Sequence, residues 1–179
     1  MKQLKNNRTF ALICLIVIIC LSVVLGGLRS VKSLEKKAYK AYYNDFALYG
    51  EADDDMKKMS RYASMLSAVC NACGCTADDF PALADAFDKA VGTPYIARET
   101  YDALFRSATL SYNLLINSQT ASEQQKISAK QYFYEIDSSM RRLANNSAYN
   151  SLAQKYNKAV SGFPMSLILR NEARLIEFD

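Results

Sequence analysis

The sequence predicts an all-α protein: an N-terminal transmembrane helix followed by an elongated antiparallel helical bundle of about four long helices plus short ones. Three observations predict it. Residues 9–28 are uncharged and apolar. Apolar residues beyond them recur at spacings of three and four, the period of a helix face. Residues 122–161 contain neither glycine nor proline. We therefore expect a short basic N-terminus at 1–8, an anchor at 9–28 and a helical bundle domain at 29–179.

The anchor lies between Arg8 and Arg29 and has the length that a helix needs to cross a bilayer core of about 30 Å. A cleaved signal peptide is the competing interpretation, but its small-residue site would have to lie at Gly26-Gly27 after an unusually long apolar run. Basic residues flank the span on both sides, so the positive-inside rule does not decide its orientation. We expect a single-pass cell-membrane protein, with the side of the bundle left open.

Charge and composition exclude several classes of function. Four of the 22 basic residues are the only charges in the first 29 residues, which leaves 18 basic residues against 18 acidic ones in the rest of the chain. The basic excess therefore belongs to the membrane flanks, and we expect no nucleic-acid partner. The chain has no histidine, so a histidine-dependent catalytic triad cannot be built from it. No small-molecule substrate is evident.

After the anchor, aromatic residues at helical spacing predict a helix over 31–49 that continues from the span, with a core-facing stripe of Tyr39, Tyr42, Phe46 and Tyr49. Gly50 ends it. A second helix begins in an acidic cluster, where negative charge suits a helix N-terminus. Its apolar stripe is Met56, Met59, Ala63, Leu66, Cys70 and Cys73.

Cys70, Cys73 and Cys75 form a cysteine cluster at the end of that stripe. A C-x-x-C pair with a third thiol is typical of metal or redox sites. However, Cys70 and Cys73 continue the apolar stripe, and the end of a helix disfavours a thiolate. The pattern favours core packing, with a disulfide or a metal site as alternatives.

Two helix starts are predicted by proline. Asp78 or Asp79 would cap a short third helix that has Pro81 in its first turn and runs through Val91. Thr93-Pro94 would open a fourth helix in the same way. The fourth helix has the stripe Tyr101, Phe105, Ala108, Tyr112 and Leu115, with Leu104 beside it.

Residues 122–162 are predicted as one long helix, opened by a capping box of Ser122 with Gln125 or of Thr120 with Glu123. It would pack through Phe133, Ile136, Met140 and Leu143, with a kink or a change of packing partner at residues 145–147. A heptad repeat follows: Tyr149-Asn150, Tyr156-Asn157 and Phe163-Pro164. The rings would form one seam on a helix face, used either to bind a partner or to hold the last helix to the bundle. Beyond it, residues 165–178 would fold back on the bundle or touch a membrane or partner.

The run YNSLAQKYNKAVSGFP, which contains this repeat, resembles the C-terminal signature of the LemA family. That resemblance implies one membrane-spanning helix, a helical bundle after it and a location at the bacterial cell membrane, and it carries hardly any mechanism. The chain departs from the family pattern at Met59–Val69, which lack an Asp-Leu-Ile-Pro segment, and at Leu169–Phe178, which replace a Gly-Phe-rich stretch.

No spaced set of catalytic groups is present, and six glycines leave little room for a phosphate loop. We therefore expect no enzyme and no cofactor. The preferred hypothesis is a membrane-anchored, non-enzymatic scaffold or interaction module that contacts lipid through its anchor and a membrane or envelope protein through the repeat. The alternative is a thiol-based redox or metal-responsive sensor that uses Cys70, Cys73 and Cys75.

Overall fold

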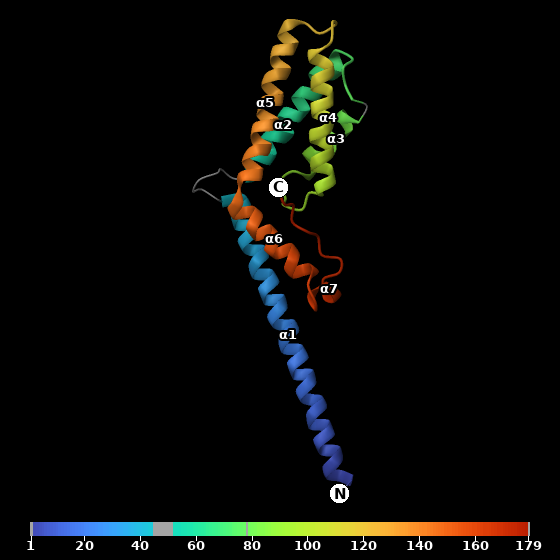
Figure 1. Cartoon of the computed structure of the whole chain (residues 1–179), viewed down its shortest axis with the longest axis vertical. Coiled ribbons are helices and arrows are strands. Elements are labelled where there is room, and N and C mark those ends of the chain that lie inside the picture. The colour runs from blue at the N-terminus through green and yellow to red at the C-terminus, as the bar shows by residue number, and fades with distance from the viewer. Residues whose placement is uncertain (1, 45–51, 78, 179) are drawn as a thin grey trace.

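The computed structural model describes residues 2–44, 52–77 and 79–178, and all regular secondary structure within them is helical. The predicted fold class is confirmed. Figure 1 shows an elongated molecule with the apolar end of the first helix projecting from it. The helices, in chain order, are α1 (Lys2–Asn44), α2 (Ala52–Ala72), α3 (Phe80–Ala90), α4 (Arg98–Ile116), α5 (Glu123–Asn145), α6 (Ser147–Ser161) and α7 (Met165–Ile168).

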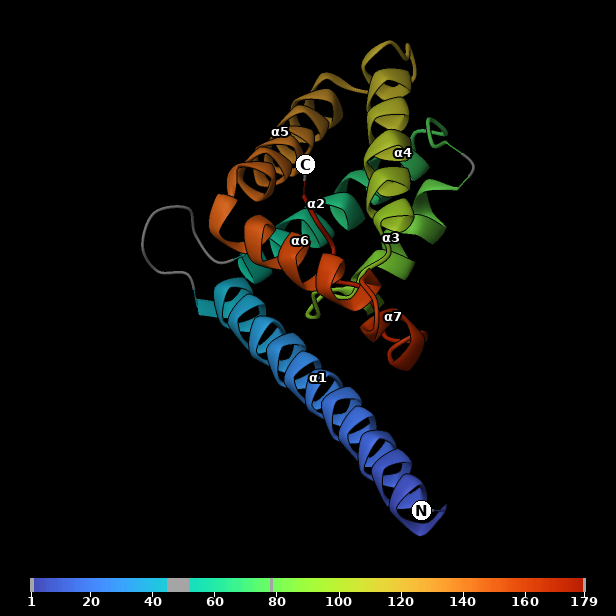
Figure 2. The same ribbon diagram turned by 60° about the horizontal axis from the view of Figure 1, so that its bottom comes forward.

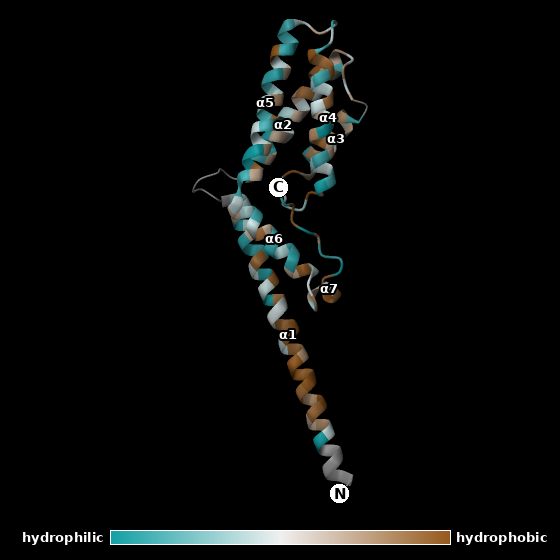
Figure 3. Cartoon of the chain, in the orientation of Figure 1, coloured by the Kyte–Doolittle hydropathy of each residue, from teal (hydrophilic) through white to brown (hydrophobic). Residues whose placement is uncertain are grey.

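Helix α1 joins the predicted anchor to the folded part of the chain without a break. Over Arg8–Tyr43 it is long and apolar enough to cross a membrane, and its most apolar stretch is not buried against the rest of the chain. Figure 3 shows that stretch at the projecting end. Farther along the same helix Val31, Ala38 and Tyr42 are buried. Phe46 and Tyr49, which were predicted to extend this stripe, lie outside the described residues.

Helices α2 to α5 form the bundle. Helix α2 packs against α3, α4 and α5, while α4 packs against α3 and α5. The predicted stripe of α2 is confirmed from Met56 to Cys70, all of which are fully buried. Cys73 lies beyond the helix and is only half-buried. The stripe of α4 buries Tyr101, Leu104, Ala108 and Leu115, and the rings of Tyr112 and Phe133 stack with centroids 4.4 Å apart.

Helix α3 begins as predicted, with Asp79 at the N-cap and proline in the first turn. The Asp79 side chain does not cap the helix but accepts a hydrogen bond from Ser107 Oγ at 2.6 Å. Asp78 lies outside the described residues. The prediction for the fourth helix was wrong, because α4 begins at Arg98 with Ala97 as its N-cap. The Pro94 carbonyl instead accepts a hydrogen bond from the Ile176 N–H, which holds residues 93–97 in a turn.

The predicted long helix is two helices. The capping box at its start is confirmed, since Ser122 Oγ accepts from the Gln125 N–H at 3.3 Å and Gln125 Oε1 accepts from the Ser122 N–H at 2.8 Å. The break falls at Asn146, which is buried, ends α5 and caps α6 by accepting from the Tyr149 N–H at 3.1 Å. The packing partner changes there: α5 lies on α2 and α4, whereas α6 lies on α1. Figure 2 shows α6 leaving the direction of α5 at this point.

Candidate functional site: a segment held by its main chain

The tyrosine-asparagine repeat of α6 binds residues 171–178 of the same chain. We call these residues the 171–178 segment; they contain no helix. Tyr149 and Tyr156 are both fully buried. The Tyr149 hydroxyl donates a hydrogen bond to the Ile176 carbonyl at 2.9 Å. Burial raises the pKa of Tyr149, so its hydroxyl keeps the proton that it donates.

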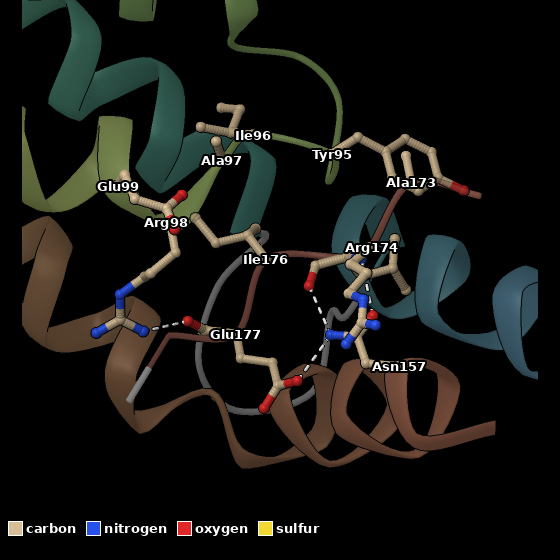
Figure 4. A pocket seen from close by; sticks show the side chains of 11 residues that line it. Tyr95, Ile96, Ala97, Arg98, Glu99, Asn157, Ala173, Arg174, Ile176 and Glu177 are labelled. Carbon is tan, nitrogen blue, oxygen red and sulfur yellow. Dashed lines mark hydrogen bonds between the residues drawn. The ribbon is translucent and has the colours of Figure 1, made fainter. Parts of the chain in front are cut away.

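Each asparagine of the repeat binds both main-chain groups of one residue in the segment. Asn157 Nδ2 donates to the Leu175 carbonyl at 2.8 Å, and Asn157 Oδ1 accepts from the Leu175 N–H at 2.9 Å. Asn150 does the same with Phe178, at 2.8 Å and 3.0 Å. Figure 4 shows the Asn157 amide facing the segment. An amide side chain presents one donor group and one acceptor, so it pairs with main chain as a neighbouring strand does.

The spacing of the repeat matches the spacing of an extended chain. Seven residues of helix rise about 10.5 Å, and three residues of extended chain cover about 10 Å. Asn150 and Asn157 are seven positions apart on α6 and bind Phe178 and Leu175, three positions apart in the segment. The heptad spacing of the two asparagines therefore matches the distance between two residues that lie three positions apart in the segment.

The other side of the segment faces the turn before α4. The Ile176 N–H donates to the Pro94 carbonyl at 2.8 Å, and Arg98 Nη1 donates to the Glu177 carbonyl. An open pocket of about 520 Å³ lies between residues 95–99 and residues 173–177. Figure 4 shows the side chains that line it. The groove that holds the segment is therefore formed by α6 on one side and by residues 94–98 on the other.

Apolar side chains complete the contact. Leu175, Ile176 and Phe178 are each 3% exposed or less. The Phe178 ring packs between Tyr101 and Tyr149, at centroid distances of 5.4 Å and 5.6 Å. Arg170 and the first four residues of the segment, 171–174, are exposed. The C-terminal half of the segment is therefore packed in the groove, while its N-terminal half is exposed.

The last pair of the repeat does not join the seam. Helix α6 ends at Ser161, and Phe163 is 85% exposed, so the predicted seam of three rings contains only two. The Phe163-Pro164 peptide bond is cis. The sequence placed the asparagines beside the seam and predicted fold-back on the bundle as one alternative for residues 165–178, but it did not identify these residues as the partner of the asparagines. The apolar residues at 175, 176 and 178 were the available signal that this stretch packs on the bundle.

Within the cysteine cluster, Cys70 does not have the properties of a reactive thiol. All five cysteines of the chain are free. Burial raises the pKa of the Cys70 thiol to about 12, whereas nucleophilic cysteines have a lowered pKa. Cys75 is buried, and its thiol donates to the Cys73 carbonyl at 3.3 Å. Among the described residues, no group of three or more histidine, cysteine or acidic side chains is arranged to hold a metal ion.

No protein-family model, curated protein or solved structure matches this chain. The resemblance to the LemA family therefore stays a prediction that rests on the repeat itself.

Proposed function

We propose that the protein is a non-enzymatic interaction module, anchored by α1 in a bacterial cell membrane, whose groove on α6 binds an extended peptide segment of a membrane or envelope protein. The observation that supports it is that Asn150 and Asn157 each bind both main-chain groups of one residue in the segment. Such contacts do not depend on the side chains of the bound peptide. A partner needs an extended stretch with apolar residues at the positions that Leu175, Ile176 and Phe178 occupy.

Two features of α1 support the anchor rather than a cleaved leader. Its apolar stretch is exposed, which is unfavourable in water over such an area. The helix also continues into the core, where Val31 is buried and where Gly27 meets Met165. Cleavage near Gly26-Gly27 would remove part of a packed contact.

A partner must compete with the 171–178 segment, which is tethered beside the groove. A short tether gives a bound segment an effective concentration in the millimolar range. The intact chain therefore binds a free peptide weakly, and a chain without the segment binds it more tightly. A partner that is itself in the membrane overcomes this competition because it is held close to the groove.

The test has two parts. A chain shortened to residues 1–170 is titrated in detergent with a fluorescent peptide of sequence NEARLIEF, and with the same peptide N-methylated at the leucine and final phenylalanine amides. We expect binding of the first peptide, much weaker binding of the second, and weaker binding of both by the full chain.

Amide hydrogen exchange on the full chain gives the second readout, which does not depend on the shortened chain folding. We expect the amides of Leu175 and Phe178 to exchange faster than those in the middle of α2, because the segment opens by itself. Equal protection of the segment and α2 would mean that the groove is a permanent part of the core, and the proposed function would then be wrong.

A further inference from the structure

The turn between α6 and α7 exposes large apolar side chains at the membrane end of the molecule. Phe163 is 85% exposed, Leu167 is 72% exposed and Ile168 is 46% exposed. In the described part of the chain outside α1, seven large apolar side chains are exposed, and these are three of them. The other four are Leu110, Leu114, Ile127 and Tyr134. Three such residues within six positions form a surface that needs an apolar environment.

These side chains lie against the apolar stretch of α1. An open groove of about 370 Å³ is lined by Ile19, Cys20, Val23 and Val24 of α1 and by Phe163, Pro164, Leu167 and Ile168. None of these side chains is charged. The exposed surface of the turn is therefore continuous with the exposed surface of α1 from Phe10 to Leu25.

The depth of this groove follows from its position along α1. Ile19 and Val24 precede Leu28, the end of the uncharged stretch, by nine and four residues, which corresponds to about 14 Å and 6 Å of helix rise. Half of a bilayer core is about 15 Å thick. A bilayer that encloses residues 9–28 of α1 therefore also encloses the groove, within the leaflet nearer the bundle.

Helix α7 is held at this depth by a close contact. A Cβ atom on Gly27 would lie 2.7 Å from Met165 Cε, so the absence of a side chain at Gly27 allows Met165 to pack on α1. Met165 is buried there. The contact fixes the turn beside α1 with Phe163 and Leu167 facing outward.

The main chain of the turn also suits a medium without water, where unpaired amide groups are costly. Pro164 has no N–H group to satisfy. The Ser166 N–H donates to the Gly162 carbonyl at 2.9 Å, and the Leu169 N–H donates to the Met165 carbonyl at 2.7 Å. The chain then leaves the turn through exposed Arg170 and Arg174, whose charges suit the headgroup region.

We infer that the turn at residues 163–168 is a second membrane contact, which inserts into the acyl chains of the bilayer beside α1 without crossing it. This inference rests on the proposed membrane location of α1. The occupant of the groove is lipid. The protein then contacts the membrane at two places: α1 spans the bilayer, and the turn inserts into one leaflet.

The absence of tryptophan from the chain allows a direct test. Three single substitutions, Phe163→Trp, Val17→Trp and Tyr134→Trp, are made in the full chain and reconstituted into phosphatidylcholine vesicles with or without brominated acyl chains. All three replace exposed side chains, so the fold is retained. Val17 reports on the anchor, and Tyr134 on α5 is the control that faces water.

We expect the Phe163→Trp and Val17→Trp proteins to emit at short wavelength and to lose most of their emission in brominated lipid. The Tyr134→Trp protein should emit at long wavelength and be quenched by aqueous acrylamide instead. If brominated lipid quenches Val17→Trp but not Phe163→Trp, the inference is overturned and the anchor remains supported. This holds both when acrylamide quenches the tryptophan at position 163 and when a second copy of the chain covers that position. A Val17→Trp protein that lipid does not quench would overturn both.

Discussion

Replacing Asn157 by alanine tests the main-chain contact most directly. The change removes both bonds to Leu175 and the 2.7 Å bond from Asn157 Nδ2 to Glu177 Oε1. It leaves the N–H and carbonyl of Leu175 unpaired in a residue that is 2% exposed. A net loss of about 1 kcal/mol for each main-chain bond, together with the cost of a buried unpaired group, gives about 3 kcal/mol.

Because 1.4 kcal/mol corresponds to a factor of ten in an equilibrium constant, the segment should be open about 100-fold more often. Amide hydrogen exchange measures this population directly. The Leu175 amide should exchange about 100-fold faster in the Asn157→Ala protein, while the middle of α2 changes little. Asn113→Ala, which removes an exposed asparagine from α4, is the matched control and should leave both rates unchanged.

Two results would refute the reasoning. An unchanged rate at Leu175 would mean that the asparagine contacts contribute nothing to holding the segment. An equal acceleration at Leu175 and in α2 would mean that the whole domain had been destabilised, so that the segment and the bundle unfold as one unit.

Three further predictions concern other parts of the fold. Gly27→Leu should displace α7 and speed exchange of the Leu169 amide, whereas Gly26→Leu, whose Cβ would meet nothing within 4 Å, should not. Arg142→Met should lower the free energy of unfolding, measured by chemical denaturation, by about 2 kcal/mol. The reason is that the buried carboxylate of Asp55 lies 2.8 Å from the Arg142 guanidinium and would lose this partner. The control Arg141→Met removes a largely exposed side chain and should lower the free energy of unfolding by less than about 0.5 kcal/mol. With a pKa of about 12, Cys70 should be alkylated by iodoacetamide at pH 8 about 1,000-fold more slowly than in the unfolded chain, as mass spectrometry can show.

The Cys70 thiol also predicts how the stability of the fold depends on pH. The pKa of Cys70 is higher in the folded chain than its ordinary value. The unfolded chain therefore loses this proton first as the pH rises. The contribution of Cys70 to stability is complete below about pH 9 and is lost progressively towards pH 12, so denaturant midpoints should fall over that range. A Cys70→Ala protein should show less of this decline.

Features that depend on neighbours in the sequence were predictable. The stripe of α2, the capping box at Ser122 and the start of α3 follow from spacing and local hydrogen bonding, and each is present. The sequence predicted a kink or a change of packing partner at residues 145–147, and the packing partner does change there. Because these residues include neither glycine nor proline, the pattern did not predict that the helix ends. The cause of the break is the competition of the Asn146 side chain for the Tyr149 N–H, a choice between cap and helix that local sequence leaves open.

Features that depend on distant partners were not predictable. Thr93-Pro94 has the residues of a helix start, but the Pro94 carbonyl binds Ile176, which lies far along the chain. The sequence likewise shows Asn150 and Asn157 only as polar residues beside the tyrosine seam. Their hydrogen-bond partners, Phe178 and Leu175, lie too far along the chain to be predicted from spacing. Spacing shows which side chains share a face, but it does not show what covers that face.

The unbroken course of α1 has a mechanical consequence. A spanning helix tilts by about 20° on average and adjusts that tilt to the thickness of its bilayer. With α1 in a membrane as proposed, no break between Lys2 and Asn44 absorbs the tilt, because α1 is one helix over that range and contacts α2 and α6. Helix α5 alone, with 23 residues, is about 35 Å long. A change of 20° in the tilt of α5 moves the far end of α5 sideways by about 12 Å. A difference in bilayer thickness therefore displaces the outer end of the bundle more than it displaces the base.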